Sequence, residues 1–537
     1  MKFKKILVLF LSLILVLSVG CGEKEEVSTE PENEENGTNV VEGSEEKIKD
    51  GGMMVFGIGD DPKILHPFYA TDRVTMTIDN ALFDPLFVRD GNETRYYLAE
   101  NVSVSEDNLT YTVKLKEGVK WHDGENLTAD DLIFTLEKLI DEKQNANAYQ
   151  NFIIGGKPIS FEKVDDLTVK IILPEVSVPF IETLAGVTPI AKHIFEGEED
   201  FTKSEKNENP IGTGPFKMKE WNKGESIILE RFDDYHNGKP HLDQVVYRVV
   251  ADSNAANVAF ENGEISVRYI DVNEYEKYQN SNDFKVYGFD EGMLNYMAFK
   301  LNNDDLKDKK VRQAIAYALD KEEIIKGAYD SLEYAVPAYT VLTPQTLYYT
   351  EDVNKYEHNV ELAKDLLKES GKENIKLTLG YISTSKEQEK EALIIQQKLK
   401  EIGIELELMP LDRGAFYQKL FEPDNRDFDL VFNGYIMGQE PDSYKLIFTK
   451  GGPYNFVGYE NEEMDKMWVQ GPMEIDKAKR QELYENIQKQ IMDEMIQYPI
   501  CYPKALIAVS GNIGGVEESK LMPIFIFEDL SKLYIIE

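Results

Sequence analysis

The sequence has little cysteine, histidine, tryptophan or positive charge, and these shortages exclude several classes of protein. Among 537 residues there are 2 cysteines, 6 histidines and 3 tryptophans, and 59 Lys and Arg stand against 98 Asp and Glu. With only two cysteines, one of them near the N-terminus, no disulfide is predicted. The net charge of −39, with no cluster of Lys and Arg, excludes nucleic acid as a partner, since binding to phosphates depends on such clusters.

Motifs for catalysis and metal binding are also missing. The histidines form no HExxH and no close pair on one helix face, so no metal site is predicted, and His122 is assigned a structural hydrogen-bonding role. There is no GxSxG motif for a serine hydrolase. The glycine-rich stretch 210–216 (PIGTGPF) lacks the Gly-Lys-Ser/Thr of a phosphate loop, and it is interpreted as a tight turn between domains. The sequence therefore predicts no catalytic residue and no cofactor.

The N-terminal segment has the pattern of an export signal. Three early lysines precede an apolar run from Ile6 to Leu17, which is too short for a comfortable membrane span, so residues 1–20 are predicted to be a signal peptide. The stretch LSVGC resembles a bacterial lipobox, with its leucine displaced by one position, and this resemblance implies lipidation of Cys21. Residues 21–50 are acidic and lack aromatic side chains, so we expect a flexible tether. The predicted location is the outer face of the cytoplasmic membrane.

The rest of the chain alternates strand-like and helix-like patterns, which indicates an α/β fold. The other cysteine, Cys501, is predicted to be a buried free thiol. The predicted strands cover 53–59, the pair within 109–121, and the strand, helix, strand unit over 375–411, which is typical of a parallel crossover. The predicted helices lie around 76–82, after the N-cap Thr128, over 309–329, and over 360–370 with Gly371 as C-cap.

A further strand, 427–435, ends in an apolar Ile-Met pair and then turns polar through Gln-Glu-Pro-Asp. We expect this strand to join the same open α/β sheet. Ligands of such sheets bind beyond the carboxyl ends of the strands, so the segment after residue 435 is predicted to lie at a binding site.

Several long segments together resemble the extracytoplasmic solute-binding proteins of ABC importers that handle oligopeptides, dipeptides and, in some members, nickel or sugars. They occur in the family's order and cover 109–137, 209–221, 230–265, 309–325 and 454–467. The resemblance implies a two-lobed, three-domain fold of the periplasmic-binding-protein type II class, which closes on its ligand by a hinge. By analogy, domain I takes 51–84, 207–290 and 500–537, domain II takes 85–206, and domain III takes 291–499.

The resemblance also implies that the segment after the strand 427–435 lines the cleft, with Tyr435, Gln439 and their neighbours as ligand-binding residues. Peptide-binding relatives often have an aspartate four residues before the proline, where it pairs with the peptide α-ammonium. Met437 occupies that position here, so the anchor has moved or is absent. Glu440 and Asp442 are the nearest carboxylates. Alternatively, Met437 simply packs into the third lobe.

Five softer candidates for the cleft combine aromatic or amide side chains with polar tips, which suit an extended ligand. They are Tyr69, Asn295, Tyr296, Tyr454 and Asn455.

The function that this resemblance implies is a lipid-anchored, monomeric receptor that binds oligopeptides and delivers them to the permease subunits of an ABC transporter. Three alternatives remain open. The same fold accommodates an oligosaccharide or another non-peptide solute, and the shortage of tryptophan weighs modestly against sugars. A receptor for peptide signals has the same sequence features. A secreted hydrolase that uses paired carboxylates is the alternative from another class.

Overall fold

A computed structural model describes residues 47–91, 93–422 and 427–537. The predicted signal peptide, Cys21 and nearly all of the tether lie outside these residues. Over the described ranges, every helix is too short or too polar to cross a membrane.

The fold is mixed α/β and two-lobed, as predicted, and it contains three large hydrophobic cores. One core gathers buried side chains from three separate stretches, 54–83, 216–267 and 507–533. The second lies within 68–201 and the third within 294–502. The exact domain boundaries stay a prediction.

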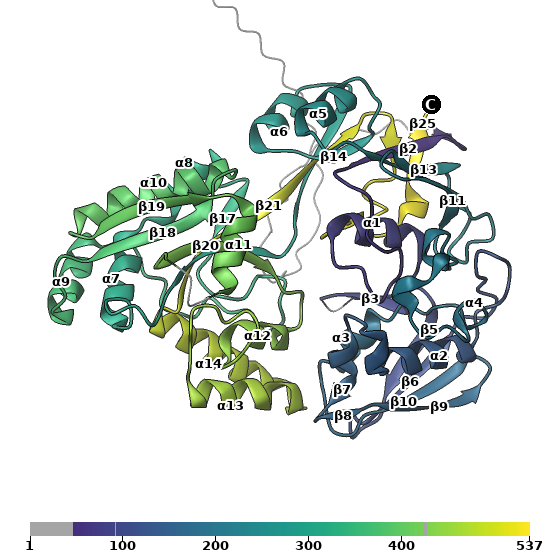
Figure 1. Ribbon diagram of the computed structural model, residues 1–537, viewed down its shortest axis with the longest axis horizontal. Coiled ribbons are helices and arrows are strands. Elements are labelled where there is room, and N and C mark those ends of the chain that lie inside the picture. Colours follow the sequence, from purple (N-terminus) through teal and green to yellow (C-terminus); the bar gives the residue numbers. More distant parts are fainter. Residues whose placement is uncertain (1–46, 92, 423–426) are drawn as a thin grey trace, which may run out of the picture. The chain divides into compact units, whose positions relative to one another are not determined.

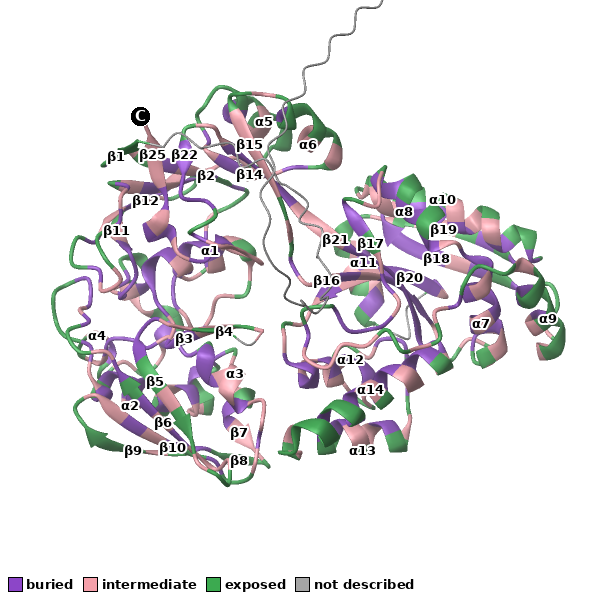
Figure 2. Ribbon diagram, turned by 180° about the vertical axis from the view of Figure 1, so that it is seen from behind, coloured by how far each residue is buried: buried purple, intermediate pink, exposed green. Residues whose placement is uncertain are grey.

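One large sheet runs through the first and third cores, and strand β21 (Gln497–Ser510) joins its two parts. Towards one end, β21 pairs antiparallel with β14 (Val267–Tyr269) and β15 (Phe284–Asp290). Towards the other end it pairs antiparallel with β16 (Met293–Phe299). Strand β21 therefore runs from one lobe to the other (Figure 1), and β15 and β16 lie beside it (Figure 2).

The predicted strand, helix, strand unit is confirmed. Strands β18 (Lys376–Ile382) and β19 (Glu405–Leu411) pair in parallel, and helix α10 (Lys386–Glu401) lies between them in the chain. Helix α10 packs on both strands, with α8 beside it (Figure 1). Buried residues line β18, while α10 shows many exposed ones, as expected for a helix that covers a sheet (Figure 2).

Two predicted helix ends are confirmed, and each has a capping residue. Helix α2 (Ala129–Leu139) begins after Thr128, which forms a capping box with Asp131. Helix α9 (Val360–Ser370) ends at Gly371, whose φ of +69° is a left-handed conformation that suits glycine.

Two predictions of elements were wrong. The single helix over 309–329 is two helices, α7 (Lys309–Ala318) and α8 (Lys321–Tyr329), because the Asp320 side chain accepts a hydrogen bond from the Glu323 amide and begins a new helix. The strand pair over 109–121 is one strand, β6 (Thr110–Leu115), because the chain turns after it and Lys120 forms only an isolated bridge with Asn126.

Three smaller predictions are confirmed. Cys501 is a buried free thiol. His122 is buried, with Nδ1 accepting from the Gly212 amide at 3.1 Å and Nε2 3.1 Å from the Gly214 carbonyl oxygen. The glycine-rich stretch bends sharply at 213–215, and its Gly214 amide donates to the Leu82 carbonyl oxygen at 2.9 Å, while its place between domains stays a prediction.

Candidate functional site

The site begins where β20 (Leu430–Ile436) ends. This strand lies inside the large sheet, in parallel with β18 and antiparallel to β16. The segment that follows it therefore begins at the carboxyl end of a strand of the open sheet, as predicted. Gly438, with a φ of +76°, then turns the chain. The Glu440 side chain accepts from the Asp442 amide at 3.2 Å and begins the short helix η6 (Pro441–Tyr444).

A cavity of about 720 Å³ lies at this strand end, and residues from all three predicted domains line it. The loop after β20 contributes Ile436, Met437, Gly438, Gln439, Glu440 and Ser443. The second core's region contributes Val88, Arg89, Asp90, Arg95 and Glu182. The remaining wall consists of residues 289–292, Gln345, residues 520–525 and Glu528. The cavity wall therefore presents positive charges, negative charges and apolar surface to a ligand.

Two hydrogen bonds connect the regions of the chain that hold the second and third cores. The Gly91 amide, at the turn between β3 (Phe87–Asp90) and β4 (Glu93–Tyr96), donates to Gln439 Oε1 at 2.6 Å. The Val178 amide donates to the Pro472 carbonyl oxygen at 2.7 Å. Both bonds join a residue of the segment 68–201, which holds the second core, to a residue of the segment 294–502, which holds the third.

Glu440 is held by Arg480. The two side chains form an ion pair in which the arginine is 2% exposed and the glutamate 9%. Burial raises the pKa of the Glu440 carboxyl, while the Arg480 charge and hydrogen bond act against that rise. Because Glu440 already has a full positive charge beside it, the pair chiefly fixes the loop.

Of the ten predicted ligand-binding residues, the structure brings three to the cavity wall. These are Met437, Gln439 and Glu440. Tyr435 and Asp442 lie close by in the chain but point to protein partners. The Tyr435 hydroxyl donates to the Val341 carbonyl oxygen at 2.6 Å, and Asp442 pairs with Lys445 at 2.6 Å.

The five softer candidates make contacts outside this cavity wall. Tyr296 is buried and packs on Tyr435, with ring centres 5.1 Å apart. Asn295 donates to the Tyr329 hydroxyl at 2.9 Å, and Tyr69 donates to the Gln144 carbonyl oxygen at 3.0 Å.

Asn455 donates to the carbonyl oxygens of Thr449 and Tyr459, and Tyr454 is 47% exposed. The binding role of all ten residues stays a prediction.

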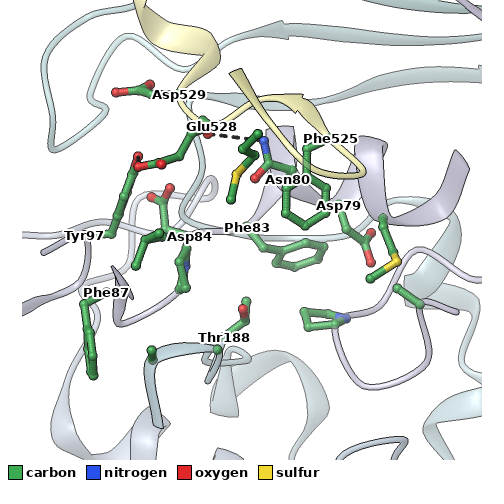
Figure 3. Close-up of a pocket in the computed structure, with 18 of the residues that line it drawn as sticks. Asp79, Asn80, Phe83, Asp84, Phe87, Tyr97, Thr188, Phe525, Glu528 and Asp529 are labelled. Carbon is green, nitrogen blue, oxygen red and sulfur yellow. Dashed lines mark hydrogen bonds between the residues drawn. The ribbon is translucent and has the colours of Figure 1, made fainter. Parts of the chain in front are cut away.

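A second cavity of about 370 Å³, drawn in Figure 3, shares lining residues with the first. Two of its carboxylates have strong partners. Asp84 accepts from the Tyr235 hydroxyl at 3.1 Å and lies 2.7 Å from His236 Nε2. Glu528 accepts from Arg95 Nε at 2.7 Å.

A third carboxylate in this second cavity, Asp79, comes from helix α1 (Arg73–Leu82). The sequence analysis missed Asp79, although one signal was present. A carboxylate inside the stretch Ile78-Asp79-Asn80-Ala81-Leu82 sits among apolar residues that are typical of a buried helix face.

Among the described residues, no group of three or more His, Cys, Asp and Glu side chains is arranged to hold a metal ion. Several charged groups of the cavities form ion pairs with one another, as in the contact of Arg89 Nε with Glu182 Oε1 at 3.0 Å.

Comparison with known proteins agrees with this geometry. Residues 93–456 match the family model of the bacterial extracellular solute-binding proteins, family 5. The chain is 30% identical to the oligopeptide-binding protein AppA of Bacillus subtilis over 542 aligned positions, covering 96% of each chain.

Solved structures are also similar to the chain, and two of them serve as examples. The crystal structure of the ABC transporter substrate binding protein CtaP from Listeria monocytogenes superposes with a TM-score of 0.89 at 45% identity, covering 91% of this chain and all of that one. The structure of B. subtilis AppA in complex with a nonapeptide has a TM-score of 0.74 at 29% identity, covering 91% and 100% of the two chains.

Proposed function

The chain belongs to family 5 of the bacterial extracellular solute-binding proteins, and from this we propose that it binds oligopeptides in the cavity between its lobes and delivers them to an ABC permease. One observation carries the proposal. The cavity of about 720 Å³ is lined from both lobes at the carboxyl end of β20, so a ligand there contacts both lobes at once. Such a ligand stabilises the closed form, which the permease then recognises.

The walls of the cavity support a peptide as the ligand. Three cationic side chains, Arg89, Arg95 and Lys520, and several carboxylates face the same space as Met437 and Pro523. A peptide carries charges of both signs, amide groups and apolar side chains, and all of these find complementary groups in such a wall. The similar protein AppA of B. subtilis was solved in complex with a nonapeptide, which is a ligand of this class.

The same wall argues against an oligosaccharide. Sugar sites stack aromatic platforms on the sugar rings, and tryptophan is the largest such platform. Trp121 and Trp468 are at most 1% exposed, and Trp221 donates to Asp61 outside the cavity wall. We therefore favour a peptide over a sugar.

We propose that the protein binds its ligand without cleaving or modifying it. Glu440, Glu182 and Glu528, which face the cavity, are each paired with an arginine. A general acid or base must exchange its proton with the substrate, and a carboxylate held by a guanidinium is a poor group for that task. The protein should return its ligand intact.

The test is mass spectrometry of what co-purifies with the protein. The Cys21→Ser chain is purified from its host without added ligand, denatured, and the released small molecules are analysed. We expect a set of peptides, which bind again when they are added back to the stripped protein in a calorimeter. A sugar or another non-peptide solute in their place, or peptides that are cleaved during incubation, would contradict the proposal.

A further inference from the structure

The second cavity is a side chamber of the cleft. Its volume is about 370 Å³, and it shares lining residues with the larger cavity, so the two spaces adjoin. The shared residues include Arg89, Glu182, Phe525 and Glu528. A ligand in the cleft can therefore extend one of its groups into the chamber.

Five carboxylates line this chamber, and four of them have partners. Asp84 and Glu528 are held as described above, and Glu182 pairs with Arg89. Asp529 accepts from the Ser531 amide and hydroxyl at 2.9 and 2.6 Å. These four groups need nothing from a ligand.

Asp79 is the exception. The residue is 8% exposed, and neither of its carboxylate oxygens has a hydrogen-bond partner within the part of the chain that the structure describes. Burial, followed by the charge of nearby Asp72, raises the pKa of the Asp79 carboxyl well above its ordinary value. A buried carboxyl group without a partner is unfavourable, which is why such groups in proteins are normally hydrogen-bonded.

The surroundings of Asp79 define what would satisfy it. Figure 3 shows its carboxylate at the chamber wall beside the rings of Phe83 and Phe525, and the lining of the chamber also includes the apolar residues Met76 and Pro67. An unpartnered hydrogen-bond acceptor beside apolar side chains is complementary to a cationic donor on an apolar stem. A primary ammonium group has that chemistry, and it pairs with a carboxylate through short, charge-assisted hydrogen bonds.

We propose that Asp79 binds a primary ammonium group of the ligand, and that the chamber around it accepts the apolar part that carries this group. The inference rests on the proposed function, in which the ligand is a peptide. Two groups of a peptide have this chemistry, namely the N-terminal amine and the side chain of a lysine. Asp79 is then a residue that determines specificity, and the chamber is the place where one end or one side chain of the peptide is selected.

The test compares the wild-type protein with Asp79→Asn, which keeps the shape of the side chain and removes its charge. Asp365→Asn is the matched control, since Asp365 is exposed on helix α9 and the change in net charge is the same. Circular dichroism melts establish that all three proteins fold.

Three synthetic hexapeptide pools of Ala, Val, Leu, Phe and Gly are titrated by calorimetry. The first pool has free N-termini, the second is acetylated, and the third is acetylated with one lysine.

We expect Asp79→Asn to weaken binding of an ammonium-bearing pool by about thirtyfold or more, because removing one partner of a buried charge pair costs at least that much. The acetylated, lysine-free pool should bind both proteins alike, and Asp365→Asn should behave as wild type. Loss with the first pool alone identifies the N-terminal amine as the bound group, and loss with the third alone identifies lysine. Equal binding of every pool to Asp79→Asn and wild type, or an equal loss with every pool, overturns the inference and leaves peptide binding intact.

If the wild-type protein binds no pool, the proposed function fails, and n-hexylammonium then tests the chamber by itself. A rise in the melting temperature of the wild-type protein but not of Asp79→Asn supports the ammonium site. The same response in both proteins overturns it.

Discussion

The Gly91 amide donates a hydrogen bond to Gln439 Oε1 across 2.6 Å, and this bond joins the turn between β3 and β4 to the loop after β20. The other end of the Gln439 side chain, Nε2, lies 3.4 Å from Asp90 Oδ1. One amide side chain thus connects the two sides of the cleft in the form that the structure shows.

Replacing this side chain should weaken ligand binding by lowering the population of the closed form. A neutral hydrogen bond contributes about 0.5–1.5 kcal/mol, so Gln439→Ala should reduce the affinity for the co-purified peptides about two- to tenfold. Calorimetric titration measures the change. Gln481→Ala, on the exposed face of helix α14 (Lys477–Glu494), is the control in the same lobe. Equal affinities of the two variants would show that the bond does not favour closure.

The buried pair of Arg480 and Glu440 gives a prediction about stability. Arg480→Ala leaves the Glu440 carboxylate buried without its cation, and breaking such a pair costs about 3–5 kcal/mol. The melting temperature should therefore fall clearly. Adding Glu440→Gln should recover part of the loss, because the buried charge is then gone. A single variant that melts like wild type, or a double variant that melts lower still, would contradict this account.

The ends of helices and strands can be predicted from the sequence where bonds between neighbouring residues define them. Thr128 and Gly371 mark a helix start and a helix end through bonds within one turn, and both were read correctly. Asp320 acts in the same local way, but the apolar periodicity continues through it, so the break between α7 and α8 was missed. The end of β20 was found because the strand and the loop are adjacent in the chain.

The rest of the site depends on contacts between distant parts of the chain. Arg480 reaches Glu440 from 40 positions away, and Gly91 reaches Gln439 from 348. No periodicity encodes such pairs. Tyr296 and Asn295 have the composition of cleft residues, yet the packing of β16 between β20 and β21 turns them to protein partners.

In the close-packed glycine-rich stretch 210–216, the addition of one methyl group at Gly212 should strongly destabilise the fold. A Cβ at Gly212 would lie 1.9 Å from the Leu82 carbonyl oxygen, and because that oxygen belongs to the backbone, no side-chain rotation can relieve the overlap. Overpacking of this kind costs about 1–3 kcal/mol or more, so Gly212→Ala should lower the melting temperature and the soluble yield. Gly59→Ala is the control, since nothing lies within 4 Å of its Cβ position. Similar melting temperatures for both variants would contradict the tight packing.

Lipid attachment gives a prediction about location. Cys21 lies outside the described residues, and the proposal for it rests on the resemblance to a lipobox. If acyl chains on Cys21 hold the protein at the membrane, Cys21→Ser should move it from the membrane fraction to the medium, because each buried methylene contributes about 0.8 kcal/mol to anchoring. Immunoblots of the two fractions measure this. Cys501→Ser should stay at the membrane, since Cys501 is buried inside the folded chain. Retention of Cys21→Ser at the membrane would refute the anchor.

The unpartnered carboxyl of Asp79 makes the stability of the ligand-free protein depend on pH. Its pKa is raised in the folded state by burial and by Asp72, so the folded protein holds this proton more tightly than the unfolded chain does. The resulting contribution to stability is complete below the ordinary carboxyl pKa, about 3.9, and is lost as the pH rises towards the raised value. Asn has no proton to lose, so Asp79→Asn escapes that loss.

The free energy of unfolding of Asp79→Asn should therefore gain on wild type by up to about 1.4 kcal/mol per pH unit above pH ~4, until the folded carboxyl itself ionises. Melts of the stripped proteins at intervals from about pH 4 to 8 measure the difference, with Asp365→Asn as the control that should follow wild type. A difference that stays constant over this range would mean that Asp79 ionises in the folded protein as it does in water. The carboxylate would then already have a partner, and it would have no need of a cation from the ligand.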